Sequence, residues 1–199
     1  HLPFDALRDF APVSLIGVFQ LGVLVAANSP FKSLADLLAA AKSKPGKLNI
    51  ATINAGSTQN LAAELFKSTE GIDVQVVPFN GTPAVITALR GGQVDAGIEI
   101  LGPVKTQVAS GALRMLATME KYGVSSWNGL AAPAKTAHSV IDRMNRDVQA
   151  VLALPAVRQK LAALDVEARG STPEQLAAQL ATETRRWADV IARAGIARQ

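Results

Sequence analysis

The feature that most constrains this chain is a pair of glycine-containing turns, each placed between a short apolar run and a helix-like pattern. The first turn spans 51–60 (ATINAGSTQN) and the second spans 77–84 (VPFNGTPA). Each has one glycine followed by hydroxyl residues where the helix begins. A helix start leaves backbone N–H groups without helical partners at the positive end of the helix dipole. Two such turns in neighbouring units predict a pocket for a small anion.

The middle of the chain alternates between strand-like and helix-like segments. The predicted strands span 48–51, 74–77, 94–100 and 113–118, and the predicted helices span 57–69, 82–90 and 102–110. Thr82 is the expected N-cap of its helix, with Pro83 at the first helical position. This alternation predicts an α/β fold with a mostly parallel sheet covered on both faces.

The two ends of the chain differ from the middle. Residues 10–27 are apolar and predict two buried strands joined near Phe19 and Gln20, whereas the chain from Thr136 onward is almost wholly helical. We therefore expect one lobe from 1–27 and 125–199, into which a second lobe, 31–118, is inserted. The crossing segments, near 26–31 and 119–126, are the candidate hinges, and a ligand is expected between the lobes.

Composition excludes several classes of protein. The net charge of +4 is spread evenly over 199 residues, so no basic patch indicates a nucleic-acid partner. The chain has no cysteine, which excludes disulfides and thiol chemistry. No apolar stretch reaches the ~18–20 residues of a membrane span. No signal peptide is visible at the N-terminus, and because the sequence begins at His1 without an initiator methionine, we expect it to begin inside a longer chain.

The residues available for catalysis are few. The histidines are His1 and His138, and no serine has a persuasive basic partner. Asp95 and Glu99 lie on one predicted strand; Asp95 is expected to be a strand-start residue, and Glu99 falls at the strand's carboxyl end, where open α/β sheets bind ligands. No metal-ligand cluster is visible. We therefore predict no catalytic residue, no metal and no cofactor.

The short polar groups at the two turns favour a carboxylate as the anion. A carboxylate that accepts charge-assisted hydrogen bonds gains about 1.5–3 kcal/mol from each bond. Two or three such bonds suffice for micromolar affinity after the cost of association, and no arginine is required. The candidate ligand-binding residues are Thr52, Asn54, Gly56, Ser57, Thr58, Asn80, Gly81, Thr82 and Glu99.

Short runs distributed along the chain resemble the Bug solute receptors of tripartite tricarboxylate transporters. The matching runs are 2–5 (LPFD), 8–13 (RDFAPV), 57–61 (STQNL), 77–84 (VPFNGTPA), 91–95 (GGQVD), 111–117 (GALRMLA) and 127–134 (WNGLAAPA). The resemblance implies a two-lobed, type II periplasmic-binding-protein fold that closes about a hinge. It also implies a periplasmic, monomeric receptor that delivers a small carboxylate (a dicarboxylate, an amino acid or an aromatic acid) to membrane transport subunits, without inserting into the membrane.

The same resemblance implies that the two turns hold one ligand carboxylate, at Gly56, Ser57, Thr58, Gly81 and Thr82. The chain departs from the family pattern within the first turn, where Asn54 stands for a common glycine and Asn60 for a common histidine. Two family segments have no counterpart: the part of the first lobe that precedes His1, and a loop near residues 120–122. We expect both to exist outside the given sequence.

Two other classes of function compete with the receptor. One is the effector-sensing domain of a cytoplasmic transcription regulator, which shares the two-lobed architecture and requires a helix-turn-helix before His1. The other is an enzyme with an open α/β sheet, which requires a base near Ser57 or Thr58, where the sequence offers none.

Overall fold

The computed structural model describes residues 3–196, so His1 lies outside the described residues. The chain divides into two compact units. Unit 1 comprises His1–Phe19 and Trp127–Gln199, and unit 2 comprises Gln20–Ser126. The chain thus crosses between units after Phe19 and after Ser126. That the segments 26–31 and 119–126 act as hinges stays a prediction.

Strand β1 (Phe10–Ala26) is one continuous strand and not the two that its sequence predicts. The expected junction at Phe19 and Gln20 is instead the boundary between the units. The strand continues because each half has its own partners. In unit 1, Gly17 to Phe19 pair with β7 (Val166–Ala168), and in unit 2 the strand pairs with two others.

Unit 2 is built on a sheet in the order β3-β2-β4-β1-β5. Its other strands are β2 (Asn49–Ile53), β3 (Gln75–Phe79), β4 (Ala96–Ile100) and β5 (Leu113–Thr118). β2 runs parallel to β3 and β4, whereas β1 runs antiparallel to β4 and β5. The predicted common direction therefore holds for β2 to β5, and β1 is the exception. It is reversed because the chain enters this sheet at the edge where the other strands end, with Leu21 opposite Ile100.

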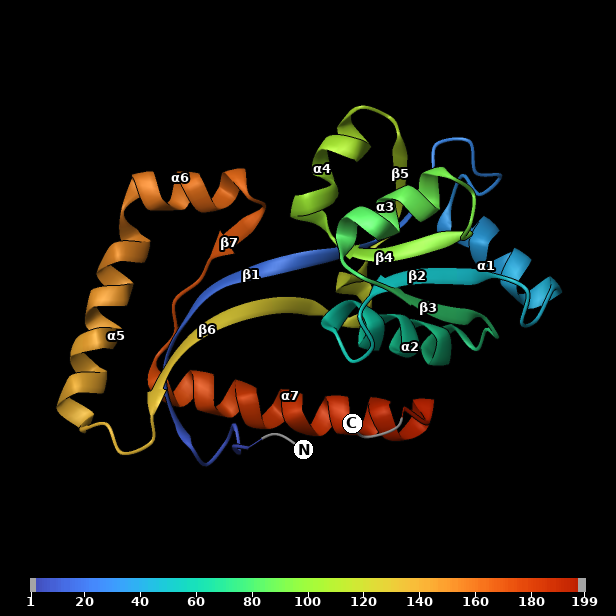
Figure 1. Ribbon diagram of the computed structural model, residues 1–199. Coiled ribbons are helices and arrows are strands. Elements are labelled where there is room, and N and C mark those ends of the chain that lie inside the picture. Colours follow the sequence, from blue (N-terminus) through green and yellow to red (C-terminus); the bar gives the residue numbers. More distant parts are fainter. Residues whose placement is uncertain (1–2, 197–199) are drawn as a thin grey trace. The chain divides into compact units, whose positions relative to one another are not determined.

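Helices cover the sheet of unit 2 on both faces. They are α1 (Leu34–Ser43), α2 (Thr58–Glu70), α3 (Thr82–Arg90) and α4 (Leu101–Ala109), followed by the 3-10 turn η1 (Met119–Tyr122). Figure 1 shows α3 above the central strands and α2 below them. A capping box begins α1: Ser33 Oγ accepts the Asp36 N–H, and the Asp36 carboxylate accepts the Ser33 N–H.

The core of unit 2 beneath α3 is apolar and closely packed. Gly97 lies on β4 under this helix, and a Cβ there would meet Leu89 Cδ1 at 3.1 Å and Val85 Cγ1 at 3.4 Å. The buried members of this cluster are Leu24, Ala51, Val85, Ala88, Leu89, Val94, Val104 and Leu113. This packing fixes where α3 begins, and hence the position of the second turn.

Unit 1 combines the first half of β1 with β6 (Ser125–Pro133), β7, and the helices α5 (His138–Ala153), α6 (Pro155–Ala163) and α7 (Pro173–Ala194). Buried polar groups hold its elements together. The Ser171 N–H donates to Ser14 Oγ at 3.0 Å, and the Asn145 side chain donates to the carbonyls of Val13 and Ser171, both at 2.7 Å. A second capping box, formed by Thr172 and Gln175, begins α7.

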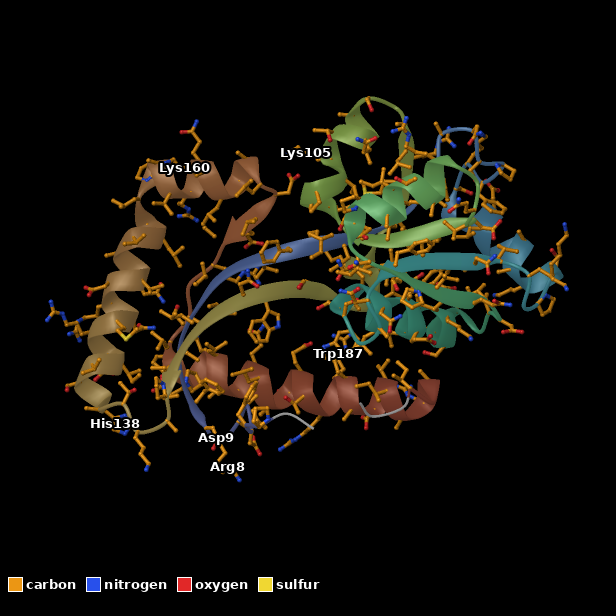
Figure 2. The ribbon with its side chains drawn as sticks, in the orientation of Figure 1. Arg8, Asp9, Lys105, His138, Lys160 and Trp187 are labelled. Carbon is orange, nitrogen blue, oxygen red and sulfur yellow. The ribbon has the colours of Figure 1, made fainter. Side chains whose placement is uncertain are left out.

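His138 and Trp187 are side chains of unit 1 that lie on helices. His138 is the first residue of α5 (Figure 2). Trp187, on α7, is half-buried and donates its ring N–H to Glu183 at 2.7 Å. Neither side chain lies in unit 2, where the two turns are.

Among residues 3–196, no helix combines the length and the apolar character needed to cross a membrane.

Candidate functional site

The two glycine turns lie side by side at the carboxyl edge of the unit 2 sheet. β2 and β3 are parallel neighbours whose last residue pair is Ile53 and Phe79. The Asn54 N–H extends this pairing by donating to the Phe79 carbonyl at 2.9 Å. The sequence prediction that the two turns are neighbours is therefore confirmed by the strand register.

The first turn is held by side chains from both of its ends. Ser57 is the N-cap of α2: its Oγ accepts the Asn60 N–H at 3.1 Å and donates to the Ile53 carbonyl at 2.8 Å. Asn60 in turn accepts the Gly56 N–H at 3.1 Å and donates to Thr52 Oγ1 at 3.2 Å. Gly56 has a φ of 78°, which a residue with a side chain rarely adopts.

The second turn differs from its prediction at the helix start. Gly81, not Thr82, is the N-cap of α3, and it makes no side-chain cap. Its φ of 87° and ψ of 163° fall in a region open almost only to glycine. Because the chain reaches the helix through this conformation, Thr82 becomes the first helical residue. Its hydroxyl then points to Glu99 and bonds there.

Glu99 joins the two turns. Its Oε2 accepts Gln59 Nε2–H at 3.2 Å, from the start of α2, and Thr82 Oγ1–H at 3.1 Å, from the start of α3. The side chain is fully buried, and Oε1 has no hydrogen-bond partner among the described residues. Glu99 is thus held on one oxygen and unpartnered on the other.

Burial raises the pKa of Glu99, because the protein interior disfavours the charged form. The hydrogen bonds from Gln59 and Thr82 act in the opposite direction and only partly offset burial. The Ile100 N–H makes the weakest opposing contribution, and it does not reach hydrogen-bond geometry with Oε1. The net result favours the neutral carboxyl more than in water.

Several backbone N–H groups at this edge have no protein acceptor among the described residues, and we call them open N–H groups. Within the described part of the chain, the N–H groups of Thr58, Gln59 and Thr82 donate to no protein acceptor. They lie in the first turns of α2 and α3, where the helix dipoles add positive potential. A small anion placed here would accept these bonds, which is the chemistry that the turns predict.

The remaining candidate residues divide into two groups. Thr52 is buried and belongs to the network of the first turn, through Asn60. The side chains of Asn54, Thr58 and Asn80 make no hydrogen bond to the described residues, and both asparagines are exposed. Asn54 and Asn80 therefore lie at the carboxyl edge of the sheet, and no hydrogen bond to the described residues fixes their side-chain amides.

Sequence reasoning did not select Gln59 and Asn60 as site residues. Both are buried polar side chains in the first turn of α2. Their position in the sequence could have indicated them. A polar residue just after an N-cap, at the carboxyl edge of a sheet, can reach the end of a neighbouring strand. Asp95, by contrast, has the predicted strand-start position, where its carboxylate accepts the Asn49 N–H at 2.8 Å.

Comparison with protein families identifies the chain. A family model described as "Tripartite tricarboxylate transporter family receptor" matches residues 1–123, more than half of the chain. The chain belongs to this receptor family. The expected relationship to the Bug receptors is confirmed by BugT of Bordetella pertussis, which is 30% identical over 213 residues. That alignment covers 98% of this chain and 65% of BugT, so the chain spans slightly less than two thirds of the length of this relative.

Solved structures of similar proteins confirm the two-lobed receptor fold. Rpa4515 of R. palustris, solved with adipate, superposes with a TM-score of 0.86 at 28% identity, over 99% of this chain and 72% of that one. MatC of Rhodopseudomonas palustris, solved with bound malate, superposes with a TM-score of 0.79 at 25% identity, over 96% of this chain and 72% of that one. Both of these structures therefore hold a small dicarboxylate.

Proposed function

We propose that this chain is part of an extracytoplasmic receptor that binds a small carboxylate at the two turns of unit 2. The observation that carries the proposal is the set of open N–H groups of Thr58, Gln59 and Thr82 at two neighbouring helix starts. Charge-assisted bonds from these donors supply about 1.5–3 kcal/mol each, which is enough for micromolar binding. The adipate and malate held by similar receptors support a carboxylate ligand.

The family supports the wider role. A receptor of a tripartite tricarboxylate transporter hands its ligand to membrane subunits, so we propose that this protein works as a periplasmic, monomeric, non-catalytic delivery protein. The expected ligand position between two lobes, with 1–27 and 125–199 on one side, remains part of this proposal. A receptor with both lobes would use this arrangement to enclose the ligand.

The proposal is tested by isothermal titration calorimetry, in which the full chain is titrated with succinate, malate, adipate, L-aspartate and benzoate. Each acid is paired with its neutral amide, which keeps the carbon skeleton and removes the charge. We expect saturable binding of at least one acid at micromolar to millimolar concentration, and no binding of its amide. Equal heats from an acid and its amide, or none from any acid, would contradict the proposal.

A further inference from the structure

We propose that Glu99 makes the unit 2 site selective for α-amino acids, by placing its unpartnered Oε1 against the ammonium group of the ligand. The inference rests on the proposed carboxylate site and names the class of ligand that this site takes. Glu99 would then be a specificity-determining residue rather than part of the carboxylate-binding turns.

The first observation is the difference between the two oxygens of Glu99. Oε2 accepts two hydrogen bonds, from Gln59 and Thr82, whereas Oε1 is buried and accepts none. Buried polar atoms in native proteins are nearly always bonded, and an unpartnered one indicates a missing donor. Oε1 therefore points to a donor that the ligand supplies.

The second observation is the lack of a countercharge. Both donors to Glu99 are neutral groups, an amide and a hydroxyl. Among residues 3–196, no lysine, arginine or histidine forms an ion pair with this carboxylate. A fully buried carboxyl without a cation favours a ligand that brings a positive charge.

The third observation is the identity of the residues that surround Glu99. Gln59 and Thr82 bond to Glu99 through their side chains, while their own N–H groups are open for the ligand carboxylate. A carboxylate bound at these N–H groups is therefore held by the same two residues that contact Glu99. Two neighbouring carboxylates repel each other, and an ammonium between them removes the repulsion.

An α-amino acid meets both requirements with one fragment. Its ammonium and carboxylate groups stand on adjacent carbon atoms, so the carboxylate can accept the helix-start N–H groups while the ammonium donates to Oε1. A plain carboxylic acid of the same skeleton fills only the first position and leaves Oε1 unpartnered. The preference for the amino member should therefore hold whatever the side chain.

The test compares acids that differ only by the α-amino group: L-alanine with propionate, L-aspartate with succinate, and L-phenylalanine with 3-phenylpropionate. Binding of each is measured by calorimetry with the full chain, as wild type, as Glu99→Gln and as the exposed control Glu120→Gln. In the wild type and in the control, we expect the amino member of any pair that binds to bind at least tenfold more tightly. In Glu99→Gln, the preference should fall below threefold.

The outcomes separate this inference from the proposed function. Plain acids that bind as tightly as their amino partners overturn the selectivity and leave the carboxylate site standing. A preference that survives in Glu99→Gln overturns the role of Glu99. Binding of no member of any pair overturns both proposals. If Glu99→Gln fails to fold by circular dichroism, the pair preference of the wild type alone decides, and its absence rejects the inference.

Discussion

The Thr82 hydroxyl donates a hydrogen bond to Glu99 Oε2 at 3.1 Å, and so ties the first residue of α3 to the carboxyl end of β4. Gln59, at the start of α2, donates to the same oxygen at 3.2 Å. One buried carboxyl therefore fixes the relative position of two helix starts. The open N–H groups beside it are held in place before a ligand arrives, which lowers the entropic cost of binding.

Replacing Thr82 with valine tests this tie. Valine keeps the shape of threonine and removes the hydroxyl, so Glu99 Oε2 loses one of its two side-chain donors. We expect the free energy of unfolding to fall by about 1–3 kcal/mol, and carboxylate binding to weaken several-fold because α3 starts less rigidly. Thr82→Ser, which keeps the hydroxyl, should retain most of both. Chemical denaturation and calorimetry make the comparison, and equal losses in the two variants would refute the tie.

The pH dependence of stability tests the environment of Glu99. Because burial raises its pKa, the folded protein binds this proton more tightly than the unfolded chain does. Stability from this group is therefore full below the unfolded pKa, about 4.3, and is lost as pH rises toward the folded pKa. Glu99→Gln cannot titrate, so its stability relative to the wild type should increase over this window. A constant difference from pH 4 to pH 8, in denaturation experiments without ligand, would contradict this assignment.

Two glycines of unit 2 form a matched pair for testing the first turn. Gly56 and Gly71 both have positive φ, 78° and 61°, and a Cβ at either would meet no atom within 4 Å. Alanine should therefore destabilise each position by a similar amount, about 1 kcal/mol. Gly71 ends α2, far along the helix from the turn. We expect only Gly56→Ala to weaken carboxylate binding; equal affinities in the two variants would remove Gly56 from the site.

The 3-10 turn η1 is tied to α2 by a second carboxylate. The Tyr122 hydroxyl donates to Glu70 Oε1, Lys121 Nζ lies 3.2 Å from the same oxygen, and the Tyr122 ring packs edge-on against Phe66. The Tyr122 hydrogen bond is the main cause that lowers the pKa of Glu70. Tyr122→Phe should cost about 1.5–3 kcal/mol of stability at neutral pH.

The acid limb of the stability profile checks this second tie. A lowered folded pKa gives stability that is present above the unfolded pKa and lost as pH falls through the folded one. The difference between wild type and Tyr122→Phe should therefore shrink below about pH 4. Lys121→Gln breaks an exposed pair and should cost at most about 1 kcal/mol. A larger loss in Lys121→Gln than in Tyr122→Phe would reverse the assignment.

Local sequence signals predicted most elements of unit 2 because those signals act over a few residues. Ser33 and Asp36 specify the start of α1 by their own side chains. Gly71 ends α2 in the left-handed conformation. Such features need no knowledge of the rest of the chain, and the predicted helices 57–69 and 82–90 are confirmed to within a residue by α2 (Thr58–Glu70) and α3 (Thr82–Arg90).

Features that depend on distant contacts were not predictable in the same way. The reversed direction of β1 follows from where the chain enters the sheet, beside Ile100, and not from the composition of the strand. The N-cap at Gly81 and the bond from Thr82 to Glu99 depend on residues 17 positions apart. The candidate site shows the same limit: the turns were visible in the sequence, but the role of Gln59 and the unpartnered Oε1 of Glu99 appear only in the folded structure.

The binding of a carboxylate by the two turns is tested most directly by nuclear magnetic resonance of the backbone amides during titration with the tightest-binding acid. We predict that the N–H resonances of Thr58, Gln59 and Thr82 shift together and saturate at the affinity measured by calorimetry. The neutral amide of the same acid should leave them in place. Saturable binding of the acid with all three resonances unmoved would contradict the central claim that the two turns hold the carboxylate.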